Sequence, residues 1–425
     1  MGRRTLPFAL AAVIAAFALS ILNMGIGSMG ISSLHPIVED DHHFVKSLEG
    51  FADKKNKASF PGRQRQDKGM GQQPRPLPPP PPPLPISPPP PPASQPATVT
   101  AFPREPFPRP PLDSIIQGWN ITGDPSWLLN FAVLGFPKCG TSTIMHHLSN
   151  HSQIQMFVDE RCELASNQEV PLIRDLYNKL PAGDYVRGIK CPMDLENTKL
   201  SMRNYQRVFP KANYIVGIRH PVLWFESFYN FRVHNRVPMK PADELIGRCG
   251  KTSRGVCTFR GNFHLFLSNL GKTNMSDPNE IQYIGPKIRR SRDPLETKTQ
   301  KVFLYDVRQL SDPDPGREVQ LLTDLQSFLG LQEPISSMIW FKPGKKHDEK
   351  IMEHVNEQKI NICDEKYTIL RDVLMEQSVN ASKWISNYFV HAPDVFVSSK
   401  EHFSNVLMKS WERDPCLDRV SKAIS

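Results

Sequence analysis

The sequence predicts an α/β fold: a P-loop-like, three-layer domain in which helices flank a central parallel sheet. Three observations predict it. Short apolar runs alternate with longer segments of helical spacing, which is the pattern of a parallel sheet. The first apolar run, residues 130–134, leads through a glycine-containing turn into a helix start. The roughly 300 residues after Ile115 are enough for one large domain with a sizeable core.

Each element is predicted from its apolar spacing and its end signals. Strands are expected at 130–134, 185–190, 213–218 and 301–305. Helices are expected at 141–150, 195–209, 223–233, 319–329 (capped by Gly330), 363–380 and 381–389. Ligands of such folds bind at the carboxyl ends of the strands. Lys138 and Arg219 come just past two of these ends, so both are candidates for binding a ligand.

Residues 1–34 are predicted to form a cytosolic tip and a signal-anchor transmembrane helix. No charged residue occurs from Thr5 to Leu34, and residues 6–22 are rich in Ala, Leu, Ile, Val and Phe. This stretch is long enough to span a bilayer. Arg3 and Arg4 favour a cytosolic N-terminus, hence a single-pass type II protein with its remainder in the lumen. A cleaved signal peptide is the alternative, and both place the rest of the chain in the secretory pathway.

Residues 35–125 are predicted to be a disordered, proline-rich stem, followed by the catalytic domain at 126–425. Residues 78–83 and 88–92 are uninterrupted proline runs. Such runs favour an extended polyproline II rod, which has no core of its own. A stiff spacer is therefore expected, with a binding site for proline-recognising domains as the alternative.

Other features of the sequence are consistent with a lumenal protein that binds anions. Four N-glycosylation triplets occur. The seven cysteines are an odd number for a lumenal protein, so at least one thiol is expected to be unpaired. Cys249 and Cys257 could close a short disulfide loop, and Cys139 is expected to be the unpaired thiol. The net charge of +9 suggests a phosphorylated cofactor or an acidic polysaccharide as ligand. Nucleic acid is not expected, because no nucleic-acid-binding module is recognisable.

The most informative segment is Gly-Phe-Pro-Lys-Cys-Gly-Thr-Ser-Thr at 135–143. A turn between a strand and a helix presents backbone N–H groups to an anion, and the helix dipole adds partial positive charge. Lys138 lies two residues before Gly140, whereas a Walker A lysine directly follows its glycine, so an ATPase or GTPase fits poorly. The candidate anion ligands are Lys138, Cys139, Gly140, Thr141, Ser142 and Thr143.

The loop and a second segment together resemble the sulfotransferases that use 3′-phosphoadenosine 5′-phosphosulfate (PAPS). The resemblance is to the Golgi carbohydrate branch, namely the heparan sulfate 3-O-sulfotransferases and the chondroitin GalNAc-4-sulfate 6-O-sulfotransferases. In that family the loop binds the 5′-phosphosulfate. A strand followed by Arg, and by Ser eight residues later, binds the 3′-phosphate. Residues 214–229 reproduce this second element, which makes Arg219 and Ser227 cofactor-binding candidates.

The resemblance also implies catalytic residues. The family's glutamate base falls on Glu160, and Lys190 matches a lysine that orients the base and the sulfonate; Lys138 contacts the phosphosulfate. The residues after Glu160 depart from the family pattern, which leaves Glu163 and Asp159 as rival bases and a simple ion pair with Arg161 as the non-catalytic alternative. His146 and His147 are further rivals. A late loop at 342–346 is the nearest match to the family's third phosphate contact.

These observations together predict a Golgi type II membrane enzyme that transfers a sulfuryl group from PAPS to a glycan hydroxyl. The transfer is expected to be an in-line displacement aided by a carboxylate base, without a metal ion. A homodimer is possible. The alternatives are a protein or small-molecule sulfotransferase, or an inactive glycan-binding protein with the cofactor fold. A nucleotide kinase is disfavoured by the displaced lysine and by the expected lack of an acidic strand end for Mg²⁺.

Overall fold

The computed structural model describes residues 102–196, 198–272, 300–338, 355–417 and 419. The chain divides into two units, 1–91 and 92–425, and every described residue belongs to the second. The predicted anchor lies outside the described residues, as do most of the predicted stem, the 342–346 loop and the glycosylation triplet at Asn274. Within the described ranges, no helix has the length and apolar character needed to cross a bilayer.

A six-stranded sheet forms the centre of the domain, with the order β4-β5-β3-β6-β7-β8. Every neighbouring pair of strands in it is parallel. The strands are β3 (Phe131–Gly135), β4 (Ile154–Met156), β5 (Val186–Lys190), β6 (Asn213–Ile218), β7 (Val302–Asp306) and β8 (Val395–Val397). The predicted parallel α/β sheet is therefore confirmed, and the carboxyl ends of β5, β3 and β6 lie next to one another.

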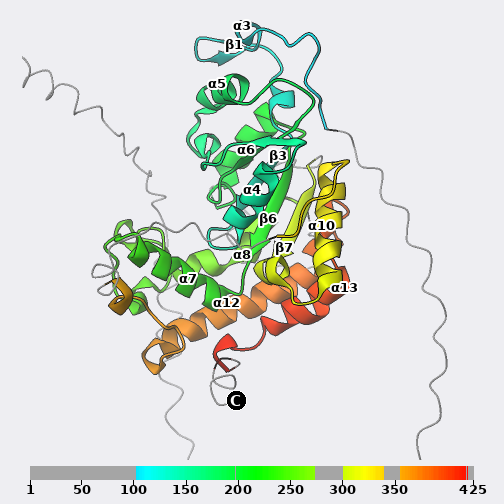
Figure 1. The fold of residues 1–425 in the computed structure, drawn as a ribbon. Coiled ribbons are helices and arrows are strands. Elements are labelled where there is room, and N and C mark those ends of the chain that lie inside the picture. The colour runs from blue at the N-terminus through cyan, green and yellow to red at the C-terminus, as the bar shows by residue number, and fades with distance from the viewer. Residues whose placement is uncertain (1–101, 197, 273–299, 339–354, 418, 420–425) are drawn as a thin grey trace, which may run out of the picture. The chain divides into compact units, whose positions relative to one another are not determined.

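Helices cover both faces of the sheet, which gives the three predicted layers (Figure 1). Successive strand residues point to opposite faces. Phe131 and Val133 of β3 accordingly join one apolar core, together with side chains of α4 and α10. Ala132 and Leu134 join the other, with side chains of five further helices. The helices are α4 (Thr141–Ser149), α5 (Glu169–Lys179), α6 (Thr198–Val208), α7 (Pro221–His234), α8 (Phe263–Ser268), α10 (Pro315–Leu329) and α12 (Thr368–Asn387).

The observed elements differ from the predicted ones mainly at short strands and at one helix. β4 and β8 have three residues each, too few for an apolar pattern to show. The two helices predicted at 363–380 and 381–389 are one continuous helix, α12, because Ser378, Ala381 and Trp384 are buried along the same face. α7 begins at Pro221, which suits the first helical turn because that position needs no N–H donor.

Ordered structure begins before the predicted boundary at residue 126. Residues 102–125 contain α3 (Leu112–Ile115) and a small hairpin of β1 (Ile116–Gln117) and β2 (Asn120–Ile121). Glu105 forms an ion pair with Arg187, which is 1% exposed. The Arg109 guanidinium lies 4.0 Å from the centre of the Tyr177 ring. These contacts are polar and long-range, so no local apolar pattern predicts them. The predicted stem is therefore too long at its C-terminal end.

Three disulfides form, and they join Cys162 to Cys191, Cys249 to Cys257, and Cys363 to Cys416. The second of these confirms the predicted loop. Cys139 is the unpaired cysteine, as predicted, and it is buried. The other two pairings were not predicted, because they join cysteines that are far apart in the sequence.

Candidate functional site

The loop between β3 and α4 has the backbone conformation of an anion cradle. Lys138 and Gly140 adopt left-handed conformations, with φ of 66° and 81°, and Gly140 is the N-cap of α4. A Cβ atom at residue 140 would lie 2.4 Å from Cδ1 of Leu310, so this position requires glycine in both conformation and space. The first turn of α4 then starts at Thr141, as the sequence predicted.

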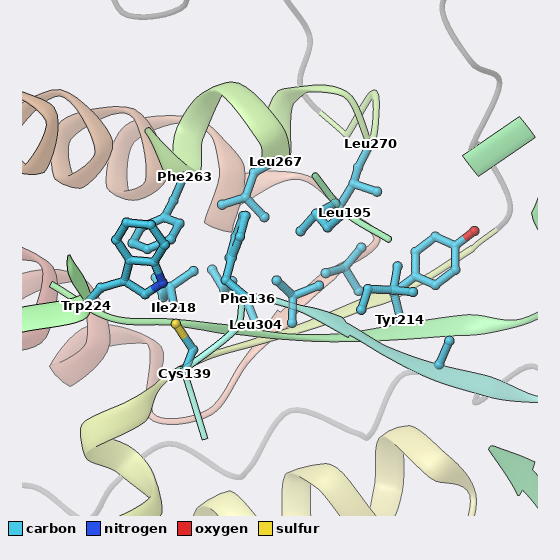
Figure 2. Packing of buried hydrophobic residues seen from close by; sticks show 14 of the residues in the cluster. Phe136, Cys139, Leu195, Tyr214, Ile218, Trp224, Phe263, Leu267, Leu270 and Leu304 are labelled. Carbon is cyan, nitrogen blue, oxygen red and sulfur yellow. The ribbon is translucent and has the colours of Figure 1, made fainter. Parts of the chain in front are cut away.

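The underside of the loop is fixed by apolar packing and one hydrogen bond. Figure 2 shows Phe136 and Cys139 directed into a cluster with Trp224 and Phe263. The Phe136 and Phe263 rings are 4.5 Å apart, and Nε1 of Trp224 donates a 2.8 Å hydrogen bond to the carbonyl of Pro137. Burial raises the pKa of the Cys139 thiol far above its usual value, so this residue anchors the loop as a neutral thiol.

Arg219 lies beside this loop, because β6 is the neighbour of β3 in the sheet. Its Nη1 atom is 3.4 Å from the carbonyl oxygen of Lys138. Its Nε atom is buried, and no described residue accepts a hydrogen bond from it. β6 can approach the loop this closely because residue 217 is glycine; a Cβ atom there would lie 2.6 Å from the carbonyl oxygen of Cys139. The two predicted phosphate elements are therefore adjacent in space.

Lys138 is a partly buried cation, and no carboxylate of the described residues forms an ion pair with it. Its Nζ atom lies 4.0 Å from the centre of the Phe231 ring. Burial, together with the positive charge of Arg219, lowers the pKa of Lys138 to about 8. A pKa depressed by burial and by a second cation indicates a place that an anionic ligand would stabilise.

Lys190, at the end of β5, connects the loop to the candidate base. Its side chain is 4% exposed, and Nζ lies 3.0 Å from Oε1 of Glu160. The same Nζ donates a 3.0 Å hydrogen bond to Oγ of Ser142, in the first turn of α4. The Glu160 side chain is 54% exposed, so one carboxylate is held against the loop and still reaches solvent.

The rival carboxylates are placed differently. Glu163 accepts a 2.8 Å hydrogen bond from Nε of Arg161, whose Nη2 also reaches Asp175 at 2.5 Å. The ion pair with Arg161, which was the non-catalytic alternative for Glu160, is made by Glu163 and Asp175. Asp159 is exposed. Glu160 is the carboxylate that contacts Lys190 among the described residues.

The rival histidines both lie on α4. His146 and His147 are half-buried, with their rings 5.7 Å apart. His146 lies 3.5 Å from the Asn150 amide at the C-terminal end of that helix.

A disulfide that the sequence analysis missed joins the segments carrying Glu160 and Lys190. Cys162 lies two residues after Glu160, and Cys191 directly follows Lys190. The backbone N–H of Arg161 also donates a 2.8 Å hydrogen bond to the carbonyl of Lys190. The sequence does place a cysteine close to each candidate residue, but it does not show that Cys162 pairs with Cys191.

Two arginines that pack against the Phe228 ring were also missed, and the Glu160 charge acts on one of them, Arg232. Their guanidinium groups lie 5.2 Å (Arg232) and 4.8 Å (Arg260) from the centre of the Phe228 ring. Arg260 forms an ion pair with the nearly buried Glu196. Nε of Arg232 is buried, and no described residue accepts a hydrogen bond from it. Burial lowers the pKa of Arg232, as does the charge of Arg260, while the Glu160 carboxylate opposes them.

Two further residues complete the comparison with the sequence. β7 does end on a carboxylate, Asp306, contrary to the expectation that no acidic strand end exists. Its oxygens accept hydrogen bonds from Arg308 and from Nε1 of Trp411, so they are already engaged. Ser227 lies on α7 and is half-buried. Its neighbour Glu226 pairs with Arg419 at 2.7 Å.

Comparison with known proteins adds little to these observations. No protein-family model matches the chain, and no curated protein sequence matches it. Among solved structures, a sulfotransferase from Alicyclobacillus acidocaldarius is similar at 16% identity with a TM-score of 0.38. The match covers 60% of this chain and 95% of the bacterial one. A TM-score this low carries no weight, so the function is inferred from the residues of the site.

Proposed function

We propose that this protein is a PAPS-dependent sulfotransferase that acts on a hydroxyl group of a glycan. The observation that carries the proposal is the pair of anion-binding elements on adjacent strands. The loop at 135–143 follows β3, and Arg219 follows β6, with its guanidinium 3.4 Å from the carbonyl of Lys138. A donor with a phosphosulfate at one end and a separate phosphate at the other needs two such elements.

The residues present fit such a donor. Lys138 and the N-terminal turn of α4 would hold the 5′-phosphosulfate, and Arg219 with Ser227 would hold the 3′-phosphate. The buried Nε of Arg219 has no acceptor among the described residues, which supports this assignment, because a buried guanidinium donor without an acceptor is costly and a phosphate oxygen would satisfy it. When bound, PAPS supplies the sulfuryl group. Lys138 would stabilise the negative charge that develops on the departing phosphate.

Glu160 is proposed as the general base. A sugar hydroxyl is a weak nucleophile, so a carboxylate must draw off its proton as the new bond forms. Glu160 is exposed enough to meet an acceptor, and Lys190 holds it at 3.0 Å while also contacting Ser142 of the loop. This arrangement would keep the base oriented towards the place where the sulfuryl group is held.

The acceptor is proposed to be an acidic glycan. Arg232 is half-buried, and its buried Nε atom has no acceptor among the described residues; it lies where the Glu160 charge acts on it. A carboxylate or sulfate on the acceptor would satisfy its fork of donors. The apolar segment 5–34, which has no charged residue and follows Arg3 and Arg4, supports a membrane-anchored enzyme in the Golgi lumen, where such glycans are made.

Ligand-dependent thermal stability tests the donor assignment. The full chain, purified in detergent, is heated with PAPS, with its desulfated product, or with ATP and Mg²⁺. Ligand at 100 times its Kd stabilises a fold by about 2.7 kcal/mol, which raises Tm by several degrees. A shift with PAPS and its product, but not with ATP, is expected. Equal shifts with all ligands, or none with PAPS, contradict the proposal.

Transfer of labelled sulfate then tests the reaction itself. The acceptors are chondroitin and heparan polysaccharides and their desulfated, carboxyl-reduced counterparts. Label is expected on the charged glycans at the higher rate. Donor binding without transfer to any glycan would point to a protein or small-molecule acceptor, or to an inactive protein.

A further inference from the structure

We infer that the Cys162–Cys191 disulfide is a positioning device: it holds Glu160 against Lys190 and so sets the rate of the transfer step without affecting donor binding. The inference rests on the proposed function, in which Glu160 is the base. The two cysteines themselves are positioning residues, since they act through the residues beside them.

The candidate base needs such a device because of where it lies. Residues 157–162 form neither helix nor strand, and the Glu160 side chain is half exposed. A long, exposed side chain on irregular backbone samples many conformations, and fixing it in one of them costs conformational entropy. The ion pair with Lys190 is too weak to do this alone, since pairs with an exposed partner contribute little.

Three tethers made by the two residues that follow Glu160 compensate for the irregular backbone. Arg161 donates its backbone N–H to the carbonyl of Lys190 at 2.8 Å. The Arg161 side chain reaches Asp175 of α5 at 2.5 Å. Cys162 is covalently bonded to Cys191, whose backbone continues the buried strand β5. The disulfide is the covalent tether, and it joins the two residues that flank the Glu160–Lys190 pair.

The donor half of the site does not depend on this bond. The loop at 135–143 is enclosed by β3, α4 and the apolar cluster around Phe136. Arg219 is placed by β6. Loss of the Cys162–Cys191 bond should therefore lower kcat and leave the donor affinity unchanged.

The test compares two disulfide deletions in the full chain. Cys162→Ala with Cys191→Ala is expected to lower kcat about 10- to 100-fold, since a misplacement of about 1 Å at a reacting group can cost 100-fold. The Kd of the desulfated donor should change less than twofold. The control, Cys363→Ala with Cys416→Ala, opens a longer loop and should lower Tm while kcat stays within about threefold. Equal losses of kcat in both variants would overturn the inference.

A double-mutant cycle separates positioning from a general structural role. In a Glu160→Gln background the base is already absent, so deleting the Cys162–Cys191 bond should cause no further loss of kcat. If the deletion costs the same factor with and without Glu160, the disulfide acts elsewhere and the inference is wrong.

Hydrogen exchange tests the inference in the wild-type protein, so it requires neither transfer activity nor a folded disulfide variant. The folded wild-type protein is treated with dithiothreitol, and the backbone exchange of residues 157–163 is followed by mass spectrometry. Faster exchange there, including the amide of Arg161, is expected once the Cys162–Cys191 bond is reduced. Unchanged exchange overturns the inference. A wild-type protein that transfers no sulfate would instead refute the proposed function, and exchange would still decide whether the disulfide holds this segment.

Discussion

The donor loop and the Glu160–Lys190 pair lie at the same edge of the sheet but are built in opposite ways. The loop is one run of nine residues, held from below by packing of Phe136 and Cys139. The pair is assembled from two segments 30 residues apart, on irregular backbone and a strand end, and is joined by a disulfide. The loop residues are adjacent in sequence and are fixed by apolar packing and a hydrogen bond from Trp224, whereas the pair comes from two distant segments joined by a covalent bond. Mutations in the two halves should therefore separate donor binding from transfer.

Glu160→Gln should give the largest effect. The amide keeps the shape of the side chain but cannot accept a proton, so the rate of transfer is expected to fall about 10²- to 10⁴-fold. Donor binding should stay within about twofold of wild type, because the loop does not use Glu160. Single-turnover transfer and calorimetric titration with the desulfated donor measure the two quantities.

Glu163→Gln is the matched control for that prediction. Glu163 is engaged by Arg161, so its loss should reduce stability more than transfer. If Glu163→Gln abolishes transfer and Glu160→Gln does not, the base has been assigned to the wrong carboxylate.

Asp194→Asn tests the buried segment that follows β5, a few residues beyond Lys190. Asp194 is fully buried, and burial raises its pKa to about 7 against the donated hydrogen bonds of Tyr205 and Ser201. Between pH 4 and 7 the folded state therefore binds more protons than the unfolded state, and stability falls as pH rises. A shift of about three pKa units corresponds to a loss of about 4 kcal/mol at most.

Urea denaturation at pH 4.5, 6 and 7.5 measures this loss. The asparagine variant should lack most of the pH dependence over that range, since its side chain does not titrate. Parallel curves for the variant and the wild type would show that Asp194 is not the group responsible.

Arg219→Ala should weaken donor binding. Hydrogen bonds to charged groups contribute about 1.5–3 kcal/mol, which corresponds to a roughly 10- to 150-fold rise in Kd for the desulfated donor. Titration with adenosine 5′-phosphosulfate, which lacks the 3′-phosphate, gives the specific comparison, because its affinity should be almost unaffected. Arg236→Ala removes an exposed arginine just after α7 and should change neither value. Equal weakening of both ligands by Arg219→Ala would mean that this arginine does not read the 3′-phosphate.

Donor affinity should fall at alkaline pH because of Lys138. Only the protonated amine attracts the phosphosulfate, and its pKa in the free protein is lowered to about 8. Affinity should be constant near pH 7 and should fall by up to about tenfold for each pH unit above 8. The fall should disappear in Lys138→Arg, which stays charged throughout that range. A fall of the same steepness in both proteins would assign the titration to another group.

The sequence by itself determined the parallel α/β fold and the donor loop. Strands such as 213–218 are fully buried apolar runs, and the loop needs only Lys138, Gly140 and a helix start in sequence order. Local backbone preference and periodicity act over a few residues, so they can be recognised in the sequence alone. The unpaired Cys139 and the short Cys249–Cys257 loop could be predicted for the same reason.

Only the tertiary structure decided which carboxylate meets Lys190, that the buried Nε of Arg232 has no acceptor among the described residues, and that Cys162 bonds to Cys191. It also decided that residues 102–125 belong to the ordered part of the chain. These features depend on contacts between residues far apart in sequence. The energy of such a contact depends on burial and geometry, and neither can be seen in short-range sequence patterns. The donor half of the site could therefore be predicted from the sequence, whereas the acceptor half required the tertiary structure.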